Sequence, residues 1–179
     1  MLLHACCAPC LTRGLDLLSG VFCVTVFFCN PNLAPESEYQ KRLDNVRLLV
    51  DAWNTEYGSD IDLLVPEYAS GEFSERVRGL ESEPENGARC GGCYALRLEK
   101  TAICAKQNGF ECFSTTLTTG PRKPASAINP IGAELERRLG IPFFAVDLKK
   151  GDGYKKSLVL SEKYGLYRQS YCGCAYSVR

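Results

Sequence analysis

The sequence lacks the features that mark several common classes of protein. Its 21 basic and 21 acidic residues leave a formal net charge of +0, and the pI is near 6.6. A globally basic nucleic-acid binder is therefore disfavoured, and any contact with RNA must depend on local patches. No apolar stretch approaches the length of a membrane span, so we expect no membrane partner.

Targeting and repeat signals are also missing. The opening MLLHACC has no basic segment and only a short apolar run, unlike a signal peptide. Internal repeats, low-complexity tracts and long linkers are absent. With 179 residues and 45% hydrophobic composition, the chain is expected to form one cytoplasmic α/β domain over residues 1–179.

Cysteine, by contrast, is abundant. The sequence has 11 cysteines, an odd number, and several of them are closely spaced. Without an export signal, such spacing favours metal binding or catalysis over a disulfide framework. Two motifs stand out: CCAPC, with Cys6, Cys7 and Cys10, and CGGC, with Cys90 and Cys93.

Hydrophobic periodicity predicts alternating strands and helices. The expected strands cover 1–5, 21–28, 61–65, 110–117 and 142–148, and the expected helices cover 10–19, 35–58, 70–80, 93–108, 125–139 and 155–164. This order predicts a Rossmann-like parallel sheet of about five strands with helices on both faces. Ligands of such sheets bind beyond the carboxyl ends of the strands, and the cysteine motifs are expected there.

The two cysteine motifs are expected to form one metal site. Four thiolates suit a tetrahedral zinc ion or a [4Fe–4S] cluster equally well on spacing alone. The Gly91-Gly92 pair is expected to let a turn curl around the metal. The adjacent Cys6 and Cys7 side chains are expected to diverge, which leaves a fifth thiolate for a second metal. A structural zinc site and a dithiol redox pair of Cys7 with Cys10 remain open alternatives.

A third cysteine pair, Cys172 and Cys174, lies in the C-terminal YRQSYCGCAYS. An unanchored terminus would ordinarily be polar, so we expect this tail to fold back onto the domain. The two thiols are candidate catalytic or metal-binding groups, with simple packing as the alternative. Cys23, Cys104 and Cys112 fall in apolar segments and are expected in the core.

Polar residues near the expected crevice complete the set of candidates. Asp147 ends the apolar run FFAVD and is a candidate metal ligand or catalytic group, with helix capping as the alternative. His4, the single histidine, is expected to be an oriented core residue. Candidate RNA-binding residues combine positive charge with an aromatic face for stacking on an unpaired base. They are Arg122, Lys123, Tyr167 and Arg168.

Five segments together resemble the cobalamin-independent, QueH-type epoxyqueuosine reductase family across essentially the whole chain. They are LLHACCAPC, FCNPN followed by SEYQKRL, RCGGCYALRLEKTA, FSTTL and GLYRQSYCGCAYS. Cys29 and the TTLTTGPRKP stretch depart from the family pattern, and the second departure concerns the substrate loop. The resemblance implies a fold similar to the adenine-nucleotide α-hydrolase-like layers of tRNA-thiolating enzymes. The Ser-Gly-Gly-x-Asp-Ser loop of those enzymes is missing, which disfavours ATP activation.

The resemblance also implies a function. It would be reduction of the epoxide of epoxyqueuosine to queuosine at the tRNA wobble position, the last step of that pathway. Cys7, Cys10, Cys90 and Cys93 are the candidate ligands of a [4Fe–4S] cluster. Cys6 and Asp147 are further candidate metal ligands for a site that would also take a mononuclear iron, and the resemblance leaves open which thiolate binds which metal. The implied partners are a tRNA anticodon arm and an external electron donor. A structural zinc-binding RNA module, a thiol–disulfide oxidoreductase and a sulfur-transfer enzyme remain the competing classes.

Overall fold

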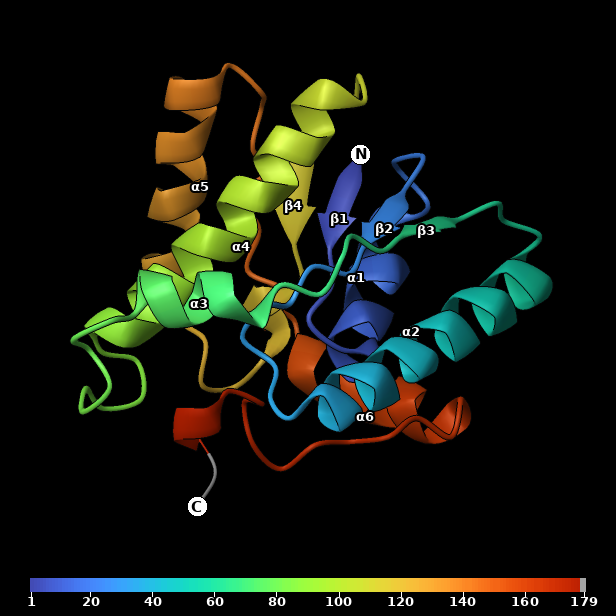
Figure 1. The fold of residues 1–179 in the computed structure, drawn as a ribbon. Helices are drawn as coiled ribbons and strands as arrows, with labels where there is room; N and C mark the ends of the chain where they lie inside the picture. Colours follow the sequence, from blue (N-terminus) through green and yellow to red (C-terminus); the bar gives the residue numbers. More distant parts are fainter. Residues whose placement is uncertain (178–179) are drawn as a thin grey trace.

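A computed structural model describes residues 1–177 and shows a parallel four-stranded sheet (Figure 1). The strands are β1 (Leu2–His4), β2 (Thr25–Phe27), β3 (Asp62–Leu64) and β4 (Phe113–Thr115), in the order β3-β2-β1-β4. In the centre of the register, Leu3 pairs with Val26 on one side and with Ser114 on the other. All four strands therefore end at the same edge of the sheet.

Alternating side chains of the strands supply two separate hydrophobic cores. Leu3 and Val26 belong to the core that contains residues of α1 (Ala8–Leu18) and α2 (Glu36–Tyr57). Leu2 and Phe27 belong to the core that contains residues of α4 (Ala88–Gln107) and α5 (Ala125–Leu139). Because successive strand residues point to opposite faces, helices cover both faces of the sheet, as the sequence predicts.

Two further helices pack on these layers. The short α3 (Ser70–Arg76) contacts α4, and α6 (Gly153–Lys163) contacts α1. Single 3-10 turns follow β4 (η1, Leu117–Thr119) and end the described chain (η2, Ala175–Ser177). In Figure 1 the tail runs beneath the carboxyl ends of the strands.

The expected fifth strand over 142–148 is wrong. Its only ladder contact within residues 1–177 is an isolated parallel bridge between Phe113 and Phe143. The Ser114 hydroxyl donates to the Phe144 backbone oxygen at 2.8 Å, and the Asn129 amide donates to the Val146 backbone oxygen at 3.5 Å. The backbone ladder does not continue past this bridge, and side chains of β4 and α5 bind the carbonyl oxygens at 144 and 146 instead.

The expected turn around Gly91-Gly92 is also wrong. Both glycines lie inside α4, which begins at Ala88, five residues before the predicted start at Cys93. Neither glycine has a positive φ. The spacing of CGGC therefore places Cys90 and Cys93 about one turn apart on one helix.

The C-terminal tail is folded back, as expected. The Ala34 N–H donates to the Gly173 backbone oxygen at 2.8 Å. Arg42, buried on α2, donates from its Nη1 atom to the Cys172 backbone oxygen at 2.9 Å, and its Nε atom binds Glu38 Oε1 at 2.7 Å. The tail is thus attached to the first turns of α2.

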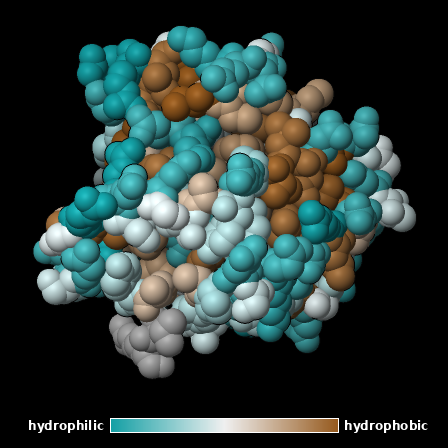
Figure 2. Space-filling model, viewed as in Figure 1, coloured by the Kyte–Doolittle hydropathy of each residue, from teal (hydrophilic) through white to brown (hydrophobic). Residues whose placement is uncertain are grey.

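The surface is of mixed character. Figure 2, in the same view, shows hydrophobic residues gathered over the sheet edge formed by β3, where Leu64 is 36% exposed and Val65 is 37% exposed. The lower region, where the tail lies, is paler and more polar. None of the described helices is both long enough and apolar enough to cross a membrane.

Candidate functional site

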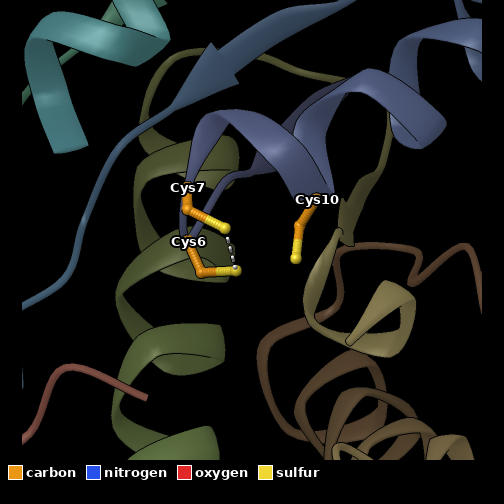
Figure 3. Close-up of side chains that lie close together, drawn as sticks. All are labelled: Cys6, Cys7 and Cys10. Atoms are coloured by element: carbon orange, nitrogen blue, oxygen red, sulfur yellow. Dashed lines mark hydrogen bonds between the residues drawn. The ribbon is translucent and has the colours of Figure 1, made fainter. Parts of the chain in front are cut away.

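The junction of β1 and α1 gathers three thiols. Cys7 is the N-cap of α1 with an extended backbone (φ −172°), and Cys10 follows three residues later in the first turn. Side chains at these two positions of a helix start face one another, as in a capping box. The Sγ atoms of Cys6, Cys7 and Cys10 all lie within 4.8 Å of one another (Figure 3).

Cys6 and Cys7 converge, contrary to the expectation from their adjacency in the sequence. Their Sγ atoms are 3.7 Å apart, and Figure 3 shows both pointing into the space that Cys10 also faces. The chain leaves an extended segment at Cys7 and enters a helix at Ala8, so consecutive side chains do not alternate as they would in a strand. Three sulfur ligands are therefore available to one metal centre.

The three thiols have strongly different pKa values. Hydrogen bonds from Cys10 and Cys7 lower the pKa of Cys6 well below its usual value, and Lys123 and Arg97 contribute to this shift. For Cys7, the hydrogen bond with Cys10 lowers the pKa, whereas the hydrogen bond with Cys6 and burial raise it. The net result is that the pKa of Cys7 is raised to about 11. Hydrogen bonding to Cys6 and Cys7 raises the pKa of Cys10. Cys6 is thus the most acidic of the three thiols.

Two cationic side chains face this thiolate. The Lys123 Nζ atom lies 4.0 Å from Cys6 Sγ. Arg97, on α4, is only 1% exposed. Burial disfavours both cations, yet negative charge on the surrounding cysteines raises the pKa of each side chain above its ordinary value. The site is therefore a positively charged pocket that stabilises thiolates.

The CGGC cysteines lie beside this group without joining it. Cys93 is buried in a small cluster with Cys174 of the tail. Cys90 is half-buried, and its Sγ atom accepts a hydrogen bond from the Asn86 N–H at 3.2 Å. Neither belongs to the group of sulfur atoms within 4.8 Å of one another. Burial raises the pKa of the Cys93 thiol.

The tail carries a second thiolate. A hydrogen bond from Cys174 lowers the pKa of Cys172 well below its usual value, and Lys123 and Arg97 lower it further. The same hydrogen bond raises the pKa of Cys174. The two cations thus act on thiolates from both ends of the chain, Cys6 and Cys172.

A cavity of about 320 Å³ opens beside these groups. Cys10 and Cys172 both line it, and so do three of the four predicted RNA-binding residues, Arg122, Lys123 and Arg168. Arg122 is exposed, and its Nη1 atom lies 3.4 Å from Glu85 Oε2. Thiols therefore meet basic side chains in one cavity at the carboxyl edge of the sheet.

Tyr167, the fourth predicted RNA-binding residue, has other contacts. Its hydroxyl donates to Glu38 Oε2 at 3.2 Å, and Lys41 Nζ lies 3.6 Å from the centre of its ring. Tyr167 does not line the cavity. The structure thus places this ring against α2, and a role in stacking on RNA stays a prediction.

Asp147 lies in a turn. Its Oδ1 atom accepts a hydrogen bond from the Lys149 N–H at 3.2 Å and is 4.0 Å from Lys149 Nζ. It is not one of the groups gathered around Cys6. The contacts resemble the capping alternative, and a metal-binding role of Asp147 stays a prediction.

His4 is a core histidine. It is 0% exposed, and both ring nitrogens have partners. Because a carbonyl can only accept, Nε2–H donates to the Cys29 backbone oxygen at 3.1 Å, and Nδ1 accepts from the Thr115 hydroxyl at 2.9 Å. Burial, assisted by Arg97, lowers the pKa of His4 to about 3. The imidazole is therefore neutral and orients the end of β1.

Sequence reasoning missed Arg97 and the hydrogen bonds of Lys149. Arg97 stands four residues after Cys93 in a predicted helix, and this spacing alone places the two side chains on one face. Lys149 Nζ donates to the backbone oxygens of Thr118 and Lys123 at 3.2 and 2.6 Å. No local pattern could have revealed the hydrogen bond from Lys149 to the Lys123 backbone oxygen, because it joins loops 26 residues apart in the chain.

The fold and the site together define an α/β protein with a thiol-rich, positively charged centre at the carboxyl edge of a parallel sheet. Residues 1–179 match the family model described as epoxyqueuosine reductase QueH. Proteins with that name are similar to this chain along nearly the whole length of this chain. One from Streptococcus pyogenes serotype M1 is 38% identical over 179 residues, which are 100% of this chain and 70% of the relative.

Two further relatives with the same name agree. The Staphylococcus epidermidis protein is 35% identical over 99% of this chain and 75% of its own length. The Thermotoga maritima protein is 38% identical over 99% of this chain and 90% of its own length. The chain belongs to the epoxyqueuosine reductase QueH family.

Proposed function

We propose that this protein is an oxidoreductase that reduces the epoxide of epoxyqueuosine to the alkene of queuosine in tRNA. The observation that carries the proposal is the convergence of Cys6, Cys7 and Cys10 beside two cations, in a chain that matches this family from end to end. Such a site offers sulfur ligands for a redox-active metal group, beside two cations that would offset the negative charge of bound thiolates.

The cofactor that we propose is a [4Fe–4S] cluster held by Cys7, Cys10, Cys90 and Cys93, with a neighbouring mononuclear iron near Cys6 and Asp147. The donor set fits, because thiolate is the ligand of iron–sulfur clusters and the cations Lys123 and Arg97 offset its negative charge. When bound, these groups would supply single electrons and a Lewis-acidic position for the epoxide oxygen.

Reduction of the epoxide needs two electrons and two protons, and the oxygen leaves as water. The chain offers a proton at Cys174, whose thiol donates to Cys172 at the cavity wall. Lys123 holds a positive charge near the cavity, where it would stabilise a developing oxyanion. Cys172 and Cys174 are therefore our candidate catalytic residues, with Asp147 as an alternative. An external donor must supply the electrons.

The substrate would enter as an unpaired nucleotide of the anticodon arm. Unpaired loop bases are splayed out at low cost, and the cavity of about 320 Å³ has the size of a small-ligand pocket. Arg122 and Arg168 are exposed at the cavity and would contact the phosphates around that nucleotide. A tRNA substrate would also place the enzyme in the cytoplasm.

The deciding experiment is anaerobic purification followed by measurement of iron, zinc and acid-labile sulfide, together with turnover of epoxyqueuosine-containing tRNA. We expect about four sulfides with at least four irons per chain, visible absorption that bleaches on reduction, and conversion to queuosine. Zinc without sulfide in freshly prepared protein would overturn the cofactor proposal. A loaded cluster with no conversion under any strong reductant would overturn the activity.

A further inference from the structure

Arg97 is a buried cation with incomplete hydrogen bonding. It is among the largest side chains that are less than 2% exposed. Its Nε–H donates to the Cys93 backbone oxygen at 3.3 Å, while Nη2 is buried without any hydrogen-bond partner. Guanidinium groups stay charged in proteins, so this N–H group keeps its desolvation cost uncompensated in the protein alone.

The charge of Arg97 also has no carboxylate to balance it. Among the salt bridges of residues 1–177, Arg97 takes part in none, whereas Arg42, another buried arginine, binds Glu38. A buried charge without a partner is strongly destabilising, and such groups persist where they have a function. The unpaired guanidinium is therefore not explained by the stability of the fold.

The sulfur groups that Arg97 does face come from three segments. Its electrostatic neighbours are Cys93 on its own helix, Cys172 in the tail and Cys6 at the end of β1. Lys123 approaches the same thiolates from the loop after β4. Arg97 is thus the cation inside the sheet–helix interface, and Lys123 is the cation on the cavity side.

We infer that Arg97 is a positioning and charge-compensating residue that stabilises the reduced form of the redox centre at this site. The inference rests on the proposed iron–sulfur function and names the residue that sets its potential. A fixed positive charge and an N–H donor beside the sulfur ligands both stabilise the form with the extra electron. Both therefore raise the reduction potential.

The test compares Arg97→Met, which keeps the length and removes the charge, with Arg97→Lys, which keeps the charge. Arg47→Met serves as the matched control, because Arg47 is exposed and pairs only with nearby Asp44. Each anaerobically loaded full-length protein is titrated by spectroelectrochemistry. For Arg97→Met we expect at least about a tenfold shift of the one-electron equilibrium toward the oxidised form, which corresponds to about 59 mV more negative.

Arg97→Lys should retain most of the wild-type potential, and Arg47→Met all of it. A wild-type potential in Arg97→Met, or an equal shift in Arg97→Met and Arg97→Lys, would overturn the inference. Loss of the cluster from Arg97→Met but not from Arg97→Lys would support it, and loss from both would overturn it. Wild-type protein without iron and sulfide would instead overturn the cofactor proposal, before any variant is compared.

A second measurement does not need the cluster. In the reduced, metal-free chain, Arg97 lacks its full counter-charge, so Arg97→Met should have an equal or higher Tm than the wild type. A clearly lower Tm would show that the guanidinium serves the fold instead of the redox centre. This outcome would overturn the inference whatever the potential shows.

Discussion

Lys149 Nζ donates a hydrogen bond to the backbone oxygen of Lys123 at 2.6 Å. The same ammonium group also contacts the backbone oxygens of Thr118 and Gly120 at 3.2 and 3.5 Å. Lys149 therefore fastens the loop whose last residue faces the Cys6 thiolate. Lys149 binds the backbone of the loop, and Lys123 places its positive charge next to Cys6.

This relationship predicts that Lys149→Met lowers kcat/KM by about 10-fold or more, because Lys123 loses its fixed place when hydrogen bonds of about 1 kcal/mol each are removed. Lys150→Met is the control, since Lys150 is the exposed neighbour in the same turn. Activity assays with the modified tRNA and iron content should be measured together. Equal activities of the two variants would contradict the assigned role of Lys149.

The group formed by Cys6, Cys7 and Cys10 predicts a loss of bound metal when any one of its thiols is removed. Replacing Cys6, Cys7 or Cys10 singly by Ser should lower bound iron by more than about half, because Ser is a poor ligand for iron–sulfur centres. Cys23→Ser should bind iron like the wild type, since Cys23 is an exposed free thiol and the expectation that it lies in the core is wrong. Iron and sulfide analysis after identical anaerobic reconstitution provides the comparison, and full iron binding by all three variants would remove the triad from the site.

The tail contact predicts an unusual sensitivity at Gly173. Its φ is +103°, and an added Cβ would lie 2.4 Å from Leu33 Cδ2 and 2.8 Å from Arg42 Nη2. Gly173→Ala should therefore destabilise the protein by about 2–4 kcal/mol and release Cys172 and Cys174 from the site. Gly151→Ala isolates the backbone strain, because Gly151 has a φ of +62° with no atom within 4 Å of the added Cβ.

For Gly151→Ala we expect a cost of about 1 kcal/mol. Denaturant unfolding gives both values, and a thiol reagent reports the exposure of Cys172. Equal stability losses at the two glycines would show that the tail is not packed tightly against α2.

The cavity predicts where tRNA binds. Charge reversal at Arg122 and Arg168 should weaken tRNA binding about uniformly across sequences and reduce the salt-dependence slope by about 1 for each residue. Arg47→Glu is the control at an exposed position outside the cavity. Filter binding or fluorescence anisotropy over a salt series should show the difference. Unchanged affinity after both reversals would exclude the cavity mouth as the tRNA contact.

His4 predicts a pH dependence of stability. Burial holds its pKa at about 3 in the folded protein, against 6.5 for an unperturbed imidazole. Between these values the unfolded chain binds a proton that the folded chain does not, so the unfolding free energy falls as the pH decreases. The loss from this group should reach about 2 kcal/mol near pH ~5.

Denaturant unfolding at several pH values, with His4→Gln for comparison, measures this contribution. The variant should show a shallower decline below about pH 6.5, even if it is less stable throughout. Parallel pH profiles of the two proteins would contradict a neutral, buried His4.

The sequence by itself determined the alternation of strands and helices, both helical layers and the place of Cys6, Cys7 and Cys10 at one edge of the sheet. Local periodicity carries this information, because each element buries the face that its own residues define. Local periodicity did not show that the segment 142–148 would pair with β4 through a single bridge only. The side chains of Ser114 and Asn129, which lie 30 and 17 residues away in the chain, donate hydrogen bonds to the backbone oxygens at 144 and 146, where the ladder is absent.

Only the tertiary structure decided which charges meet the thiols. The motifs predicted the thiols themselves, but Arg97 and Lys123 come to Cys6 from α4 and from the loop after β4, 91 and 117 residues away. The convergence of Cys6 with Cys7 likewise depends on the backbone angles at the N-cap of α1. Sequence spacing fixes which residues share a helix face, whereas the electrostatic field at a site depends on distances in space that only packing sets.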